Sequence, residues 1–124
     1  MYIGGSEGVG IYENNSFNKL GSVTSEFIGT VRDFEIIDDS LYCATNLGIF
    51  IFRNDDFVMI GDTRQVVYNL EKDENDVLWY GTEEGLFKLK DGKIEQLQLM
   101  NDPASNFIDF INYKDEKLFV GTNN

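Results

Sequence analysis

Short runs of alternating apolar and polar residues follow one another along the whole chain, with Gly, Asn and Asp between them. Such runs predict β-strands joined by tight turns, and no segment has the apolar spacing of an amphipathic helix. Between 66 and 99 the pattern predicts four strands in series, at 66–71, 78–81, 86–89 and 94–99. The last two runs are joined by Asp91-Gly92, a dipeptide typical of a tight hairpin.

This four-strand unit is repeated along the chain. Its second strand carries an aromatic residue in every copy, and the steps between these residues are 40, 37 and 40. The aromatic residues are Tyr2, Tyr42, Trp79 and Phe119. A period near 40 that is built of short strands is the sequence signature of a β-propeller blade. The repeated aromatic position predicts packing between neighbouring blades rather than a binding site.

The fold predicted from this repeat is all-β: a partial β-propeller of about three four-stranded blades, not closed within one chain. It forms a single domain over 1–124, with blades at about 1–21 (incomplete), 31–61, 66–100 and 107–124 (incomplete). Propellers close with 4–8 blades. We therefore expect the chain to be a piece of a longer propeller. Alternatively, two chains pair through their open blade edges, so that 107–113 completes the first blade of the partner.

Composition narrows the possible functions. The chain has 22 acidic and 10 basic residues, a net charge of -12, which argues against a nucleic-acid partner. It has no His, the commonest general base and metal ligand. The single cysteine, Cys43, cannot form an internal disulfide, so it does not reveal the redox compartment. No apolar run approaches the roughly 20 residues of a membrane span, so we expect no membrane insertion.

Two segments resemble ligand loops but lack the residues that such loops need. The glycine-rich start, 4–10, has no following helix and no Lys-Ser/Thr pair, so it is not a phosphate loop. The acidic turn 73–76 lacks the glycine and the distal Glu of a calcium loop. We expect no metal, no cofactor and no catalytic residue.

A polar residue recurs near the start of each first strand. These residues are Asp33, Asn69 and Asp109, at steps of 36 and 40. We expect them to bond the backbone of a neighbouring blade, because buried polar groups need partners. The alternative is a polar lining around the central channel.

The third repeat resembles a known family. Asp73 is followed by a short turn and then by Leu78-Trp79-Tyr80-Gly81-Thr82-Glu83-Glu84-Gly85-Leu86, which is similar to the two-component regulator propeller repeat. The second copy departs from it at Tyr42 and Ala44, and the first at Tyr2 and Gly5. The resemblance covers essentially the whole chain.

The resemblance implies a role in sensing. In that family the repeats form the extracytoplasmic sensor part of hybrid histidine kinases, mainly in Bacteroidetes, and typically recognise oligosaccharides. It therefore implies a non-catalytic ligand-binding module in an extracytoplasmic (periplasmic) location, with an oligosaccharide as the ligand. A structural protein–protein interaction segment of an envelope assembly is the alternative, and a propeller-based carbohydrate-active enzyme is a weaker one.

Candidate binding residues lie in the loops that crowd one face of a propeller, because loops tolerate change and carry binding groups. Those loops are the fourth-to-first and second-to-third connections. The residues predicted for the site are Asn46, Arg64, Glu83, Glu84 and Asn106. Arg64 stands out because arginine is scarce in this chain and makes forked hydrogen bonds.

Overall fold

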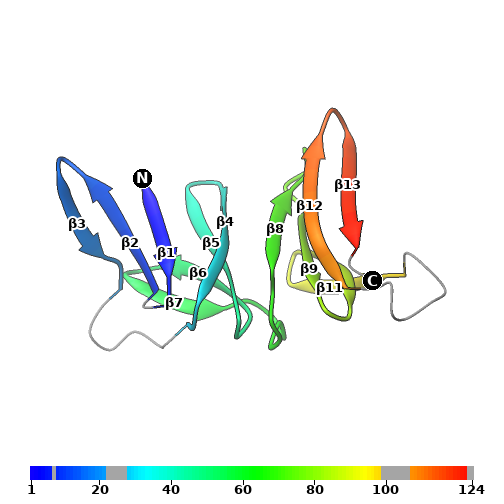
Figure 1. Ribbon diagram of the computed structural model, residues 1–124, viewed down its shortest axis with the longest axis horizontal. Helices are drawn as coiled ribbons and strands as arrows, with labels where there is room; N and C mark the ends of the chain where they lie inside the picture. The colour runs from blue at the N-terminus through cyan, green and yellow to red at the C-terminus, as the bar shows by residue number, and fades with distance from the viewer. Residues whose placement is uncertain (7, 22–27, 99–106, 123–124) are drawn as a thin grey trace.

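The computed structural model describes residues 1–6, 8–21, 28–98 and 107–122. Within these ranges the chain contains thirteen β-strands and no helix. The strands form four antiparallel sheets of two to four strands, and none of the sheets closes into a barrel (Figure 1). The fold is therefore the predicted one, an all-β partial propeller of about three blades.

Strand order within each sheet follows the order of the chain. The first sheet contains β1 (Tyr2–Gly5), β2 (Gly8–Glu13) and β3 (Ser16–Lys19). The second contains β4 (Val31–Ile37), β5 (Ser40–Thr45), β6 (Ile49–Arg53) and β7 (Asp56–Met59). The third contains β8 (Asn69–Lys72), β9 (Leu78–Thr82), β10 (Gly85–Lys90) and β11 (Lys93–Leu97). The fourth contains β12 (Ile108–Lys114) and β13 (Lys117–Thr122).

Two-residue turns set the register of five hairpins. Both turn residues have positive φ in each of them, as a type I′ turn requires, and this explains the Asn and Asp residues between the runs. The turns are Asn14-Asn15, Asp38-Asp39, Asn54-Asp55, Asp91-Gly92 and Asp115-Glu116.

The core lies between the sheets, where facing side chains pack in three separate clusters. Val9, Cys43 and Phe50 belong to the first cluster, between the first and second sheets. Ile49, Leu70 and Tyr80 belong to the second, and Leu86, Ile108 and Ile111 to the third. The second and third sheets each bury one face against the preceding sheet and the other against the next, which is how propeller blades stack.

The repeated aromatic residues pack between sheets in three of the four copies. Tyr42 and Trp79 lie against the second and third clusters, and the Tyr2 ring lies 6.4 Å from that of Phe34 in the second sheet. Phe119 differs, since 53% of its surface is exposed. No described sheet covers its side of the fourth sheet.

The first strands β4, β8 and β12 lie next to one another (Figure 1). Asp33 lies opposite Ala44 and Asn69 lies opposite Gly81, as the repeat predicts. In the fourth sheet, however, Phe110 occupies this position opposite Gly121, one residue after Asp109. The second sheet has the same register shift, between Val31 and Asp33. The predicted equivalence of Asp109 with the other two polar residues is therefore wrong by one residue.

Candidate functional site

The second-to-third turns of the two four-stranded sheets have the same internal hydrogen bonds. The Thr45 hydroxyl donates to the Gly48 carbonyl oxygen at 3.0 Å and accepts from the Leu47 amide at 3.0 Å. In the next sheet the Thr82 hydroxyl donates to the Gly85 carbonyl oxygen at 3.2 Å. Gly48 and Gly85 have φ of 145° and 142°, which favour glycine. These turns hold the predicted residues Asn46, Glu83 and Glu84 at the corresponding place in each sheet.

Asn46, which follows β5, is hydrogen-bonded to Thr30, the residue before β4. Its side-chain Oδ1 accepts a hydrogen bond from the Thr30 amide at 2.7 Å, and its own amide donates to the Thr30 carbonyl oxygen at 3.1 Å. A Cβ atom at neighbouring Gly29 would collide with this oxygen, so the close approach depends on glycine. The side-chain oxygen predicted to bind a ligand is thus used to fix the start of β4.

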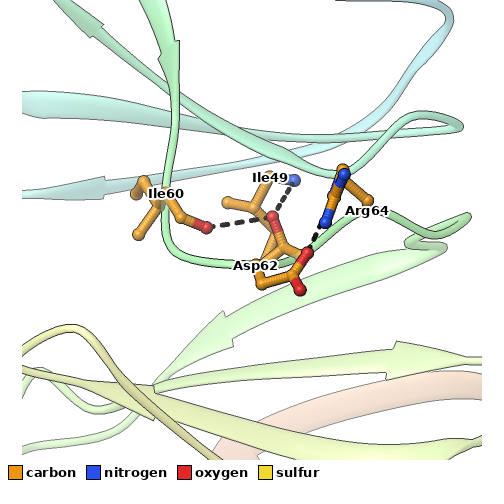
Figure 2. A network of polar contacts seen from close by, with 5 residues as sticks. Ile49, Ile60, Asp62 and Arg64 are labelled. Carbon is orange, nitrogen blue, oxygen red and sulfur yellow. Dashed lines mark hydrogen bonds and ion pairs between the residues drawn. The ribbon is translucent and has the colours of Figure 1, made fainter.

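Arg64 lies on the loop between β7 and β8 and forms an exposed ion pair. Its Nε donates to Asp62 Oδ1 at 2.9 Å, with both side chains about three-quarters exposed (Figure 2). The loop is anchored by buried Thr63, whose hydroxyl accepts from the Ile49 amide and donates to the Ile60 carbonyl oxygen. The guanidinium is thereby presented on a fixed backbone, but its Nε is already bonded within the loop.

Glu83 and Glu84 are adjacent but form different kinds of hydrogen bond: Glu83 through its side chain and Glu84 through its backbone. The Glu83 carboxylate accepts a hydrogen bond from the Tyr68 hydroxyl at 2.7 Å. Glu84 takes part through its backbone: its amide donates to Thr82 Oγ1, and its carbonyl oxygen accepts from Gln96 Nε2. Its side chain is exposed.

Tyr68 is the centre of a group of side chains from three sheets, which we call the Tyr68 cluster: Arg32, Tyr68, Glu83 and Phe107. The Arg32 guanidinium carbon lies 4.9 Å from the centre of the Tyr68 ring. The Phe107 ring lies 5.0 Å from it, tilted by 35°. Tyr68 and Phe107 are half-buried, whereas Arg32 and Glu83 are exposed. The cluster therefore places two aromatic rings beside one cation and one carboxylate at the surface.

The electrostatics of the cluster follow from these contacts. The hydrogen bond to Glu83 raises the pKa of the Tyr68 hydroxyl, desolvation and the Glu83 charge raise it further, and Arg32 opposes the shift. Tyr68 is therefore a hydrogen-bond donor at neutral pH and not a base. The cluster can offer aromatic surface, a carboxylate acceptor and guanidinium donors to a polar ligand.

The structure brings one predicted site residue, Glu83, into the Tyr68 cluster and places Asn46, Arg64 and Glu84 elsewhere. Asn106 lies outside the described residues. The sequence analysis missed Arg32, Tyr68 and Phe107 because they lie in or just before the first strands, which were assigned to the core. One signal could have found them. The equivalent positions Arg32, Tyr68 and Asp109 hold different residue types, and in the second and fourth sheets a register shift lies at this position.

A cleft of about 580 Å³ is lined by residues of the second and third sheets. Its lining includes Tyr42, Ile51, Arg53, Asp76 and Asp91. Arg53, Asp76 and Asp91 lie at or beside turns at the ends of these sheets that are opposite the Thr45 and Thr82 turns. The sequence analysis did not predict this cleft.

Among the residues that the structure describes, no group of three or more Cys, Asp and Glu side chains is arranged to hold a metal ion. The same residues include no helix that is long and apolar enough to cross a membrane.

Known structures resemble this chain over almost its whole length. One is the extracellular domain of BT4673 from B. thetaiotaomicron, described as a one-component system, with a TM-score of 0.81 and 24% sequence identity. A second structure of that domain, described as a hybrid two-component system, gives a TM-score of 0.80 and 26% identity. Both comparisons cover 98% of this chain and 17% of the other. No family model and no curated protein matches the sequence.

These neighbours confirm the resemblance to the sensor propellers of two-component regulators that the repeat predicted. The chain spans 17% of the length of each neighbour, so it corresponds to a small part of a much larger extracellular domain.

Proposed function

We propose that this chain is a non-catalytic, ligand-binding part of an extracytoplasmic sensor propeller, and that the Tyr68 cluster binds an oligosaccharide. One observation carries the proposal: three sheets contribute Arg32, Tyr68, Glu83 and Phe107 to a single exposed group. A site that spans several blades is suited to sensing, because a ligand bound there contacts several blades at once.

The chemistry of the cluster fits a sugar. A pyranose ring has an apolar face that packs on aromatic surface and a rim of hydroxyls that need donors and acceptors. Phe107 and Tyr68 supply the aromatic surface. Glu83 uses one carboxylate oxygen for Tyr68, and its other oxygen is an acceptor for ligand hydroxyls. Arg32 supplies donors in a fixed fork.

The neighbours support a sensing role and an extracytoplasmic location. Their printed descriptions name an extracellular domain and a one- or two-component system. The matched extracellular domains are about six times as long as this chain, and a part in signal transduction is proposed for it only as a piece of a longer protein. The absence of His from the sequence favours binding over catalysis.

The proposal is tested by screening the purified chain against a glycan array and measuring each hit by calorimetry. Tyr68→Ala and Glu83→Gln should each weaken binding at least about tenfold. Tyr68→Ala removes aromatic surface, and Glu83→Gln removes the charged acceptor. Glu84→Gln is the matched control, since its exposed side chain is the neighbour of Glu83, and it should bind like the wild type. Binding that is unchanged in both cluster variants would place the site elsewhere, and turnover of any bound glycan would contradict the non-catalytic role.

A further inference from the structure

The cleft lined by the second and third sheets lies inside the repeat, because both of these sheets have four strands. Its volume of about 580 Å³ is within the range of small-molecule sites, roughly 300–1,000 Å³. Its lining includes turn residues from the ends of the sheets that are opposite the Thr82 turn, where Glu83 of the Tyr68 cluster lies. The cleft is therefore separate from the Tyr68 cluster.

One wall of the cleft is a row of three apolar side chains that crosses the second sheet. Tyr42 lies opposite Ile51, and Ile51 lies opposite Val58, so all three are on the same face. Ile51 is buried and Tyr42 is half-buried, but Val58 is 51% exposed. The other wall includes Leu78 and Leu89, which lie opposite each other in the third sheet and are buried. The walls therefore offer apolar surface, part of which is open to solvent.

The row is more apolar in the second sheet than in the sheets on either side. At the position of Val58 the first sheet has Asn18 and the third has Glu95. At the position of Ile51 the third sheet has Lys88, whose Nζ lies 3.3 Å from Glu95 Oε2. An exposed apolar side chain in a cleft, at a position where the neighbouring sheets are polar, indicates contact with an apolar group.

Three carboxylates lie at the mouth of the cleft. Asp38, Asp76 and Asp91 are exposed residues in or beside the turns between strands, with φ of 47°, 57° and 51°. None of the three side chains forms a hydrogen bond or an ion pair with a residue in the described part of the chain. Each carboxylate is therefore available to a ligand.

The basic residues of the lining are fewer and less available. Lys90 donates its Nζ to the Asn75 carbonyl oxygen at 3.2 Å. Arg53 forms no ion pair with any residue that the structure describes. Three available carboxylates thus face one available guanidinium, in a chain with a formal charge of -12. The potential at the mouth of the cleft favours a cation.

We propose that this cleft is a second binding site, which takes a small organic cation with an apolar body, of the arylalkylamine class. The apolar body packs against Val58 and the two leucines, and the ammonium group lies among the carboxylates at the mouth. Burial of the apolar body supplies most of the affinity, since exposed ion pairs contribute little each. The carboxylates supply the preference for positive charge. The site does not depend on the function proposed for the Tyr68 cluster.

Three probes that share a phenyl group and differ in charge test the proposal: phenethylamine (positive), phenethyl alcohol (neutral) and hydrocinnamate (negative). Each is titrated to about 20 mM into the isotopically labelled whole chain, a range that contains a millimolar Kd. The titrations use pH 7 and a constant low ionic strength, where electrostatic preferences are largest. The amide NMR signals of Ile51, Leu89 and Asp91 should shift together. Phenethylamine should bind at least about tenfold more tightly than hydrocinnamate.

A triple variant tests the role of the carboxylates at the mouth. Its substitutions are Asp38→Asn, Asp76→Asn and Asp91→Asn, and Asn tolerates the positive φ of these residues. It should bind phenethylamine at least about fivefold more weakly and phenethyl alcohol about as well as the wild type. A matched control removes the same formal charge at positive φ from residues that do not line the cleft. Its substitutions are Asp39→Asn, Asp55→Asn and Asp115→Asn.

Two single variants separate the effect of charge from that of apolar surface. Arg53→Gln removes a like charge, so it should strengthen phenethylamine binding about twofold and weaken hydrocinnamate binding. Val58→Thr places a hydroxyl on the apolar wall and should weaken the binding of all three probes about threefold. Ile36→Thr is its control, because Ile36 is an exposed residue of β4 that does not line the cleft.

Three results would overturn the proposal. One is hydrocinnamate binding as tightly as phenethylamine, and another is an equal loss of phenethylamine binding in the triple variant and its control. The third is the absence of shifts at the cleft with all three probes at about 20 mM. Tyr68→Ala should leave phenethylamine binding unchanged, so failure of the oligosaccharide site and failure of this site give different results.

Discussion

The Asp33 carboxylate joins the second sheet to the third: its Oδ2 accepts a hydrogen bond from the Leu70 amide at 2.9 Å. Its Oδ1 accepts from the Phe34 amide at 2.8 Å, which fixes the side chain in the bridging position. This contact confirms the predicted role of Asp33 in bonding a neighbouring blade. Asn69 lies at the same register position, but its buried Oδ1 has no hydrogen-bond partner among the described residues.

Replacing Asp33 with Ala should destabilise the fold by about 1.5 to 3 kcal/mol, because a partly buried amide loses a charged acceptor. Urea unfolding followed by the fluorescence of Trp79, the one tryptophan in the sequence, gives the free energy of unfolding. Asp33→Asn should cost less, since it keeps an acceptor oxygen. Asp109→Ala is the matched control, because Asp109 is exposed and displaced by one residue; an equal loss there would refute the bridging role.

Two glutamates at this sheet junction predict a dependence of stability on pH. Desolvation raises the pKa of Glu35 and of Glu71, although hydrogen bonds from neighbouring backbone groups partly oppose it. The folded state therefore keeps protons that the unfolded state has lost, so these groups favour folding below the ordinary value of 4.5. This contribution is lost as pH rises through the higher folded pKa.

The free energy of unfolding should therefore fall as pH is raised from 4.5 toward 7, measured by urea titration at constant ionic strength. Glu71→Gln should flatten this slope and stabilise the protein at pH 7. Glu116→Gln, in an exposed turn, removes the same formal charge and controls for the general effect of net charge. Identical slopes in the two variants would exclude a specific effect of Glu71.

Asp73 organises the turn before the Trp79 strand. Its Oδ1 accepts from the Asn75 and Val77 amides, and its Oδ2 accepts from Trp79 Nε1 at 3.1 Å. Burial raises the pKa of this carboxyl, but the hydrogen bonds from Trp79, Val77 and Asn75 outweigh it and lower the pKa overall.

Asp73→Ala should reduce the free energy of unfolding by about 1 to 2 kcal/mol, because three donors lose a charged acceptor in a partly exposed turn. Glu74→Ala, one residue along, should change it by less than about 0.5 kcal/mol. A shift in the Trp79 emission spectrum of the folded Asp73→Ala protein, with none in Glu74→Ala, would show directly that the indole contact is lost.

The Tyr80 hydroxyl is buried between the second and third sheets and has no hydrogen-bond partner in the described part of the chain. Desolvation raises its pKa to about 12. Tyr80→Phe removes an unpaired polar group while keeping the ring stacked 5.2 Å from Phe87, so stability should stay equal or rise by up to about 1 kcal/mol. A thermal melt checks this, and a clear loss of stability would reveal a hydrogen bond at this hydroxyl.

Cys43 provides an independent probe of the first core cluster. It is fully buried, and burial raises the pKa of its thiol to about 12. A thiol reagent at pH 8 should therefore react only after local or global unfolding, at a rate that increases steeply with urea. Immediate stoichiometric labelling of the folded protein would contradict the packing of the first two sheets.

The repeat predicted the fold well because each strand has to satisfy two constraints at once. Alternation sets which side chains face the neighbouring sheets, and the turn residues with positive φ set the register. The alternation and the turn residues can both be recognised in the sequence of 66–99 without knowledge of any contact. The register shift in β12 was not predictable in this way, since the bulge at Asp109 leaves the hydrophobic pattern almost unchanged.

The candidate site was less predictable. Asn46 was predicted to bind a ligand because it lies in a loop, yet its side chain caps the start of β4. Tyr68 was assigned to a strand, yet it precedes β8 and forms the centre of the cluster. Whether a polar side chain in a loop is free or bonded depends on contacts between segments far apart in the sequence, and no local pattern encodes those contacts.

Because each sheet consists of strands that are consecutive in the chain, its hydrogen-bonded contacts are short-range in sequence. Low contact order favours rapid folding, and a sheet of this kind can form as soon as its own strands have been synthesised. The chain can thus assemble vectorially, with each blade docking on the one that precedes it in the sequence.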